Sequence, residues 1–307
     1  MTGAFDVIGD VHGYCDKLIA LLSRLGYAES GSVWRHPGRT AVFVGDLIDR
    51  GPKQLATVDL VRRMVDGGAA KCIMGNHEFN AIAWVTRDPG RPQRFLRPHG
   101  KRANRKQHHA FLKEVEGSHR HAQTIAWFRT LPLWLDLGGL RVVHACWHQA
   151  SMDPLQALLG PGNTITDELV LLGNQPGHWA YEAIEVVCKG PDIALPGASS
   201  FKDKEGKVRR HVRVRWWEED VTTYRDAAIV AQGEEQFVPD VPLPAQWTGH
   251  PYSGPPVLFG HYWFSGVPAV ISHRFACLDF SVAKGGPLVA YRWDGERELS
   301  SEKLVWV

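Results

Sequence analysis

Acidic, amide and imidazole side chains recur in five short clusters, each at the end of an apolar stretch. The first three are the motifs GDVHG at residues 9–13, GDLIDRG at 45–51 and GNHE at 75–78. Two histidines, His144 and His261, end apolar stretches later in the chain. This mixture of carboxylate, amide and imidazole donors suits divalent ions such as Mn, Fe, Zn or Ni, and it does not suit a thiolate-bound structural zinc.

The clusters also contain the groups that phosphoryl chemistry needs. A carboxylate between two metal ions can bridge them, and two ions roughly 3.5–4 Å apart can clamp a phosphoryl group. Glycines beside the ligands let backbone and substrate approach closely. The planar guanidinium of Arg50 can grip phosphate oxygens. The residue types therefore predict a two-metal site that acts on phosphate esters.

Strands and helices that bring the motifs close together are expected around each motif. Strands are predicted at residues 5–9, 40–44, 70–74, 133–137, 140–144 and 257–259, and helices at 16–25, 54–65 and from 77. Alternating strands and helices in the first 85 residues predict a parallel sheet, with catalytic groups beyond its carboxyl edge. Gly138-Gly139 predicts a hairpin turn between two of the later strands.

Two segments break this pattern. Residues 86–121 contain ten Arg or Lys and five His but few large apolar residues, so we expect an exposed basic insertion. Such a patch can bind nucleic acid, but a solvated face or a rim for an anionic substrate is the expectation here. Residues 150–250 match no pattern. We expect residues 1–307 to form a single domain that contains both segments as insertions.

Bulk composition is that of an ordinary globular protein. The 307 residues are 22% charged with a formal net charge of +2, so no global field attracts nucleic acid or a membrane. The sequence contains no run of eighteen apolar residues, so no transmembrane helix is expected. Asp6 and Asp10 interrupt the first residues, so no signal peptide is expected. Five scattered cysteines without a CxxC pair predict a reduced, cytoplasmic protein. The oligomeric state is left open.

The order of the motifs resembles the phosphoprotein-phosphatase-like metallophosphoesterases. That family includes serine/threonine protein phosphatases and bacterial symmetrical diadenosine tetraphosphatases. The resemblance is dense over residues 5–80 and returns at 140–148 and 257–292. It implies an α/β (α+β) fold of the calcineurin-like type, a β-sandwich with mixed sheets flanked by helices. A purely parallel sheet is then too simple.

The resemblance also implies roles for individual residues. The metal ligands would be Asp10 and His12 for the first ion, Asn76, His144 and His261 for the second, and Asp46 between both. His77 would be the general acid, oriented by Asp49, and Arg50 would bind phosphate. The implied cofactors are two divalent metal ions, with Mn as the first expectation and Fe, Zn or Ni as alternatives.

One departure from the family concerns the residues after His144. A bulky Trp147 stands where many relatives have small residues, and we expect it to offer a flat face to an aromatic substrate. Cys146, which lies between His144 and Trp147, is expected to be structural and not a nucleophile. Both Arg213 and Arg215 qualify as a second phosphate-binding residue, and Arg215 is the candidate that we name.

The leading functional expectation is hydrolysis of phosphate monoesters by metal-bound hydroxide, with phosphorylated protein side chains as the first substrate class. The alternative enzyme is a symmetrical diadenosine tetraphosphate pyrophosphohydrolase, which would release two ADP molecules. An alternative of another class is a phosphate-binding regulatory protein that has lost catalysis. Retention of His77, Asp49 and the full ligand set speaks against that alternative. The expected partner is thus a phosphorylated protein side chain or a nucleotide, and no membrane.

Overall fold

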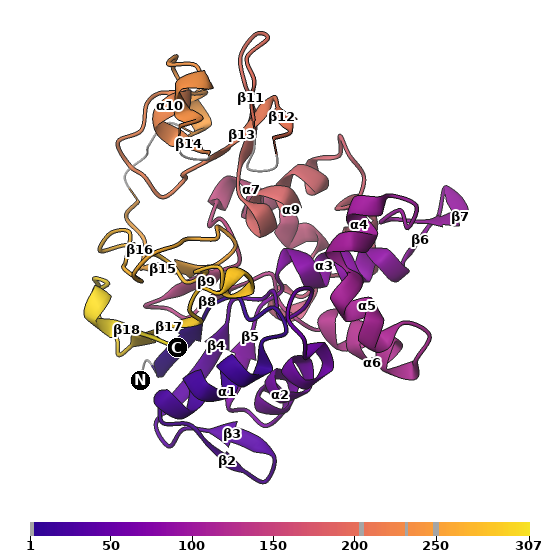
Figure 1. Cartoon of the computed structure of the whole chain (residues 1–307), viewed down its shortest axis with the longest axis vertical. Coiled ribbons are helices and arrows are strands. Elements are labelled where there is room, and N and C mark those ends of the chain that lie inside the picture. Colours follow the sequence, from indigo (N-terminus) through magenta and orange to yellow (C-terminus); the bar gives the residue numbers. More distant parts are fainter. Residues whose placement is uncertain (1–2, 203–205, 231–232, 248–251) are drawn as a thin grey trace. The chain divides into compact units, whose positions relative to one another are not determined.

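The computed structural model describes residues 3–202, 206–230, 233–247 and 252–307 (Figure 1). It divides into two compact units, one formed by Met1–Cys188 with Pro255–Val307, and the other by Lys189–Gly254. All six predicted metal ligands lie in the first unit. All but the last four residues of the second unit fall within the segment 150–250 that matched no pattern. That the whole chain forms a single domain stays a prediction.

The first unit is built on two mixed sheets. The larger sheet has the strand order β18 (Leu304–Trp306), β17 (Val289–Trp293), β1 (Ala4–Ile8), β4 (Arg39–Phe43) and β5 (Ala70–Cys72). Strands β1, β4 and β5 are parallel, as predicted, but β17 and β18 each pair antiparallel. The purely parallel sheet was therefore wrong, because strands from the far end of the chain complete it.

The smaller sheet has the strand order β16 (Phe275–Cys277), β15 (Val257–Phe259), β9 (Arg141–Val143) and β8 (Trp134–Asp136). Strands β9, β15 and β16 are parallel, and β8 pairs antiparallel with β9. The hairpin predicted from Gly138-Gly139 is thus confirmed. The carboxyl ends of three parallel strands again share one edge.

The two sheets pack face to face around one apolar core. Val7 and Val42 are register partners in the larger sheet, and Val142 and Leu258 are partners in the smaller one. All four are fully buried in the same cluster, which burial of alternate residues on facing sheets produces. The predicted β-sandwich is confirmed.

Helices cover the outer face of the larger sheet. Helix α1 (Cys15–Arg24) buries Leu18, Leu21 and Leu22, which recur at intervals of three and four residues. Helix α2 (Gln54–Asp66) packs against β5, and both helices lie over this sheet in Figure 1. The other helices of this unit are α3 (Asn76–Val85), α4 (Arg102–Gln107), α5 (His109–Val115), α6 (His119–Phe128), α7 (Gln149–Leu155), α8 (Asp167–Leu172) and α9 (Trp179–Lys189).

The basic insertion is more ordered than its composition indicated. It begins with a hairpin of β6 (Arg87–Asp88) and β7 (Arg91–Phe95) and continues into α4, α5 and the start of α6. Helix α5 buries Phe111, Leu112 and Val115 and packs on α2 and α6. The expectation of an exposed insertion was therefore wrong for this helix, because one apolar face anchors it to the first unit.

The second unit has its own small core. Its strands are β10 (Asp192–Ala194), β13 (His211–Val214) and β14 (Ala228–Ile229) in one sheet, and β11 (Phe201–Lys202) and β12 (Val208–Arg209) in another, with one helix, α10 (Tyr224–Ala227). Val212, Val214 and Val238 are fully buried or nearly so. Remaining short elements of the chain are β2 (Ala28–Ser30), β3 (Val33–Arg35), η1 (Gln156–Leu158), η2 (Pro161–Asn163), η3 (Glu235–Phe237), η4 (Ala245–Trp247), η5 (Val282–Lys284) and η6 (Ser301–Lys303).

Two further expectations concern the chain as a whole. All five cysteines are buried, and none of them forms a disulfide. None of the helices in the described part of the chain is both long enough and apolar enough to cross a bilayer.

Gly9 lies where the two sheets approach each other closely. It directly follows β1, and its N–H donates to the Val289 carbonyl oxygen at 2.9 Å. A Cβ atom at this position would overlap the backbone carbonyl of Leu278, which follows β16 in the other sheet. Because the obstacle is backbone, a side chain fits here only if the sheets separate.

We predict that Gly9→Ala lowers the free energy of unfolding by about 2 kcal/mol, the usual range for overpacking a core. Gly38→Ala is the matched control, since a Cβ there meets nothing within 4 Å and needs no left-handed backbone. The control should change stability by less than about 0.5 kcal/mol. Urea unfolding of both variants tests this, and equal stability of the two would contradict the close approach.

Candidate metal centre

The predicted ligands all lie just beyond strand ends of the two sheets. Asp10 and His12 follow β1, Asp46 follows β4, Asn76 begins α3 after β5, His144 follows β9 and His261 follows β15. Every one of these side chains is buried, with at most 5% of its surface exposed. Residues separated by up to 251 positions thus meet inside the protein.

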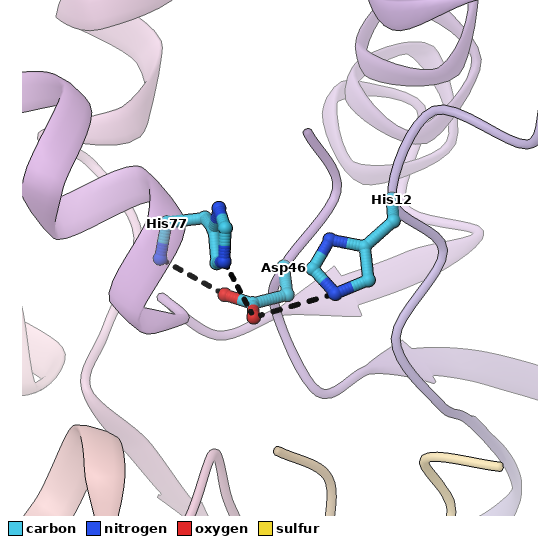
Figure 2. Close-up of side chains that lie close together, drawn as sticks. All are labelled: His12, Asp46 and His77. Atoms are coloured by element: carbon cyan, nitrogen blue, oxygen red, sulfur yellow. Dashed lines mark hydrogen bonds and ion pairs between the residues drawn. The ribbon is translucent and has the colours of Figure 1, made fainter. Parts of the chain in front are cut away.

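Two groups of possible metal ligands share Asp46. The first comprises His12, Asp46 and His77, and the second comprises Asp46, His144 and His261; in each, one ligand atom per residue lies within 4.8 Å of the others. Figure 2 shows the first group, with the Asp46 carboxylate between two imidazole rings. Asp46 Oδ2 is 3.8 Å from Nε2 of His12 and also 3.8 Å from Nε2 of His77.

Asn76 and Asp10 extend these groups. Asn76 Oδ1 lies 3.1 Å from His144 Nε2 and 2.8 Å from His261 Nδ1, so it belongs with the second group. Asp10 Oδ2 accepts the His261 backbone N–H at 3.1 Å, whereas its buried Oδ1 has no hydrogen-bond partner in the described part of the chain. A buried carboxylate oxygen without a partner is costly unless a cation satisfies it.

Glycines beside the ligands leave the carboxylates their space. A Cβ on Gly260 would overlap Asp10 Oδ1, and a Cβ on Gly75 would overlap Asp46 Oδ1. Gly75 of the motif GNHE and Gly260, which precedes His261, are therefore required by the position of the neighbouring ligand atoms.

Hydrogen bonds fix the orientation of two imidazole rings. His12 Nδ1 donates to the Ile48 carbonyl oxygen at 2.8 Å, and His144 Nδ1 donates to the Val44 carbonyl oxygen at 2.7 Å. A ring that donates through Nδ1 keeps Nε2 available as a metal ligand, the arrangement usual for metal-binding histidines.

The electrostatics of the carboxylates also fit cations. Burial, together with the nearby Asp279 carboxylate, raises the pKa of Asp10 well above its usual value. Burial would also raise the pKa of Asp46, but His144 and His77 lower it well below its usual value. A dication between these oxygens would stabilise the ionised form of Asp10 as well. The donor set, the unpartnered oxygen and this charge pattern fit two divalent ions.

Glu78 was missed by the reasoning from sequence, although it belongs to the GNHE motif. Its buried carboxylate accepts the backbone N–H groups of Asp46 and Leu47 at 2.8 Å each, and that of Gly75 at 3.0 Å. Asp46 has a left-handed backbone with φ of 52°, which is unfavourable for a residue other than glycine. Glu78 therefore holds the shared ligand in a strained conformation.

A second carboxylate, Asp49, joins two histidines. Its Oδ2 is 2.7 Å from His77 Nδ1, and its Oδ1 is 2.7 Å from His108 Nδ1. On the far side of the ring, His77 Nε2 lies 3.3 Å from Gln107 Nε2, and Gln107 Oε1 accepts a hydrogen bond from Arg97 at 2.6 Å. Sequence reasoning missed His108 and Gln107, because both lie in the basic insertion.

Charge within this network favours an ionised Asp49 and a protonated His77. Burial raises the pKa of Asp49, but hydrogen bonds to His108 and His77 outweigh it and lower that pKa. Burial lowers the pKa of His77, but the Asp46 and Asp49 carboxylates outweigh it and raise that pKa. Arg50 is exposed, and its positive charge opposes protonation of His77, which indicates that the guanidinium lies near the ring.

Three other residues named from the sequence lie outside these ligand groups. Trp147 is only 8% exposed and the guanidinium of Arg141 lies 4.7 Å from its ring centroid, so little of the ring faces solvent, and its role in substrate binding stays a prediction. Cys146 is buried, and burial raises the pKa of its thiol well above the usual value, which disfavours a nucleophile. Arg215 belongs to the second unit, and its role in phosphate binding stays a prediction.

Comparison with known proteins gives one family match and several relatives. The family model of the calcineurin-like phosphoesterases matches residues 4–195. The chain is 34% identical over 148 residues to an asymmetrical bis(5'-nucleosyl)-tetraphosphatase of Bacillus velezensis, which covers 46% of this chain and 56% of that protein. It is 27% identical over 297 residues to a symmetrical bis(5'-nucleosyl)-tetraphosphatase of Ralstonia nicotianae, which covers 93% of this chain and 87% of that protein.

The alignments with the asymmetrical tetraphosphatases cover only part of those proteins. The chain aligns with 30%, 56% and 66% of the length of three of the asymmetrical relatives. Among solved structures, a cold-active protein tyrosine phosphatase matches with a TM-score of 0.52 and 16% identity over 97% of this chain and 78% of that one. This likeness concerns the fold alone.

The family match spans more than half of the chain and includes most of the candidate ligands. The chain therefore belongs to the calcineurin-like phosphoesterases, which are hydrolases of phosphoric ester bonds.

Proposed function

We propose that the protein hydrolyses bis(5'-nucleosyl) tetraphosphates and splits diadenosine tetraphosphate symmetrically into two ADP molecules. The observation that carries the chemistry is the pair of buried ligand groups that share Asp46. The choice of substrate is supported by the relative that aligns with 93% of the chain, which is named a symmetrical tetraphosphatase. The expectation of a protein phosphatase gives way to this second expectation, because the two sequence relatives described above are both named tetraphosphatases.

The six ligands would hold two divalent ions, with Mn as the first candidate. Bound there, the ions would stabilise charge on the phosphoryl oxygens and lower the pKa of a water molecule. The exposed guanidinium of Arg50 lies near His12 and His77, whose protonation it opposes. It is therefore placed to bind phosphate oxygens with its planar set of donors.

His77 lies in the first group with His12 and Asp46, but it is the proposed proton donor to the leaving oxygen and not one of the six proposed ligands. Asp49 holds its Nδ1 at 2.7 Å, which leaves Nε2 to face the ligand cluster. Because its pKa is raised, the ring stays protonated to a higher pH than an ordinary histidine. Such a group contributes to catalysis when it lies within reach of the leaving atom. The intact network around His77 also argues against the alternative of a regulatory protein without catalysis.

The shared ligand gives a prediction on metal content. Asp46→Ala should lose most of both ions, whereas His261→Ala should lose about half of the bound metal, because only one group contains His261. Metal per chain is measured by mass spectrometry after dialysis against trace Mn, with circular dichroism as the control for folding. Equal losses in the two variants would contradict the sharing of Asp46.

The substrate assignment is tested by product analysis. With Mn added, the protein should convert diadenosine tetraphosphate into ADP as the sole nucleotide product, and chelation by EDTA should abolish turnover. Chromatography separates ADP from the ATP and AMP that asymmetrical cleavage would give. A phosphoserine peptide serves as the competing substrate. Release of ATP and AMP, or faster turnover of the peptide, would overturn the proposal.

The proton-donor network gives a graded prediction. His77→Asn should reduce turnover about 10²–10⁴-fold with metal content unchanged. His108→Leu removes one of the two hydrogen bonds to Asp49 and should cost about tenfold, the value of one hydrogen bond to a charged group. His108→Asn is the matched control, since its amide can still donate to Asp49.

Leaving-group dependence separates proton donation from a general structural effect. Phenol leaves only with protonation, whereas p-nitrophenol needs little, so both damaging variants should lose more activity on phenyl phosphate than on p-nitrophenyl phosphate. Equal losses on the two esters would show that His77 is not the proton donor and that His108 does not support proton donation.

A further inference from the structure

Trp263 is a large aromatic residue in an unfavourable position. It is 48% exposed, and its backbone has φ of 50°, in the left-handed region that bulky residues avoid. Both the exposed apolar surface and the backbone conformation disfavour a tryptophan here. Strained residues of this kind gather at functional sites, so the surroundings of Trp263 decide what the ring is for.

The ring lies beside the metal centre. Its centroid is 5.7 Å from that of the candidate ligand His261, with 36° between the ring planes. Lys284 ends η5, which follows β16 in the chain. This lysine is exposed, and its ammonium lies 5.8 Å from the indole centroid of Trp263. An aromatic face and a positive charge therefore adjoin the place where phosphates would bind.

Asp279 fixes the two loops that carry these groups. Its carboxylate is 1% exposed; Oδ2 accepts the Trp263 backbone N–H at 2.8 Å and Oδ1 accepts the Ser281 backbone N–H at 2.9 Å. Ser281 directly precedes η5, which carries Lys284. One buried carboxylate thus anchors the backbone of both loops.

We propose that Trp263 is a stacking surface for a nucleobase of the substrate, with Lys284 facing the polyphosphate. The nucleotide class of the ligand rests on the function proposed above, whereas the aromatic surface rests on the structure. Bases stack on tryptophan because both present flat π faces. Trp147, the ring expected from the sequence to stack, is only 8% exposed, whereas Trp263 is 48% exposed.

Equilibrium binding separates stacking from phosphate binding. ADP and inorganic pyrophosphate are titrated into the Mn-loaded protein by calorimetry. Trp263→Ala should weaken ADP binding about tenfold, the loss of one stacked base, and leave pyrophosphate binding unchanged. Trp263→Phe should restore part of the ADP affinity. Trp179→Ala is the matched control, because Trp179 is another tryptophan of similar exposure, 44%, in the same unit.

Three results would overturn the inference. They are equal ADP affinity in wild type and Trp263→Ala, a parallel loss of ADP and pyrophosphate binding, and a wild-type affinity for ADP no higher than for pyrophosphate. Failure of the proposed function is visible separately, as absence of diadenosine tetraphosphate turnover in the wild type. A selective loss of ADP binding would then still support a base-stacking site for another nucleotide.

Discussion

The position of one buried carboxylate, that of Asp46, governs the rest of the site. It lies in both candidate ligand groups, its Oδ1 accepts the His77 backbone N–H at 3.0 Å, and its own N–H is held by Glu78. A left-handed backbone at this residue is unfavourable and persists only because surrounding contacts determine it. The buried Glu78 carboxylate and the space left by Gly75 are therefore conditions for the metal centre, and the neighbouring motif supplies both.

The ligands come from both sheets of the sandwich. Asp10, Asp46 and Asn76 follow strands of the larger sheet, whereas His144 and His261 follow strands of the smaller one. The hydrogen bond from His261 N–H to Asp10 spans the two sets. Ions bound between these ligands would join the two sheets, so metal binding would also stabilise the fold, because binding to the folded state alone favours that state.

Segments outside the ligand motifs reach the candidate site through a few specific contacts. The basic insertion places His108 against Asp49 and Gln107 against His77, so its buried face supports the proposed proton donor, while most of its Arg and Lys side chains are exposed. The loop after β15 places Trp263 beside His261. In the function proposed here, segments that surround the ligand cluster would set substrate choice and proton transfer, whereas the cluster itself would account for phosphoester hydrolysis in general.

The sequence by itself determined the β8–β9 hairpin and the helices next to β1 and β4, and it named the six candidate ligands, because these depend on local spacing and on glycines at fixed positions. It did not determine which strands pair, so β17 and β18 were absent from the expected sheet. Burial was also decided by the tertiary structure alone: Trp147 is packed inside and Trp263 faces outward, although both follow a ligand histidine by two or three positions. The contact between His108 and Asp49 spans 59 residues, and only folding of the insertion onto α2 and α6 brings them together.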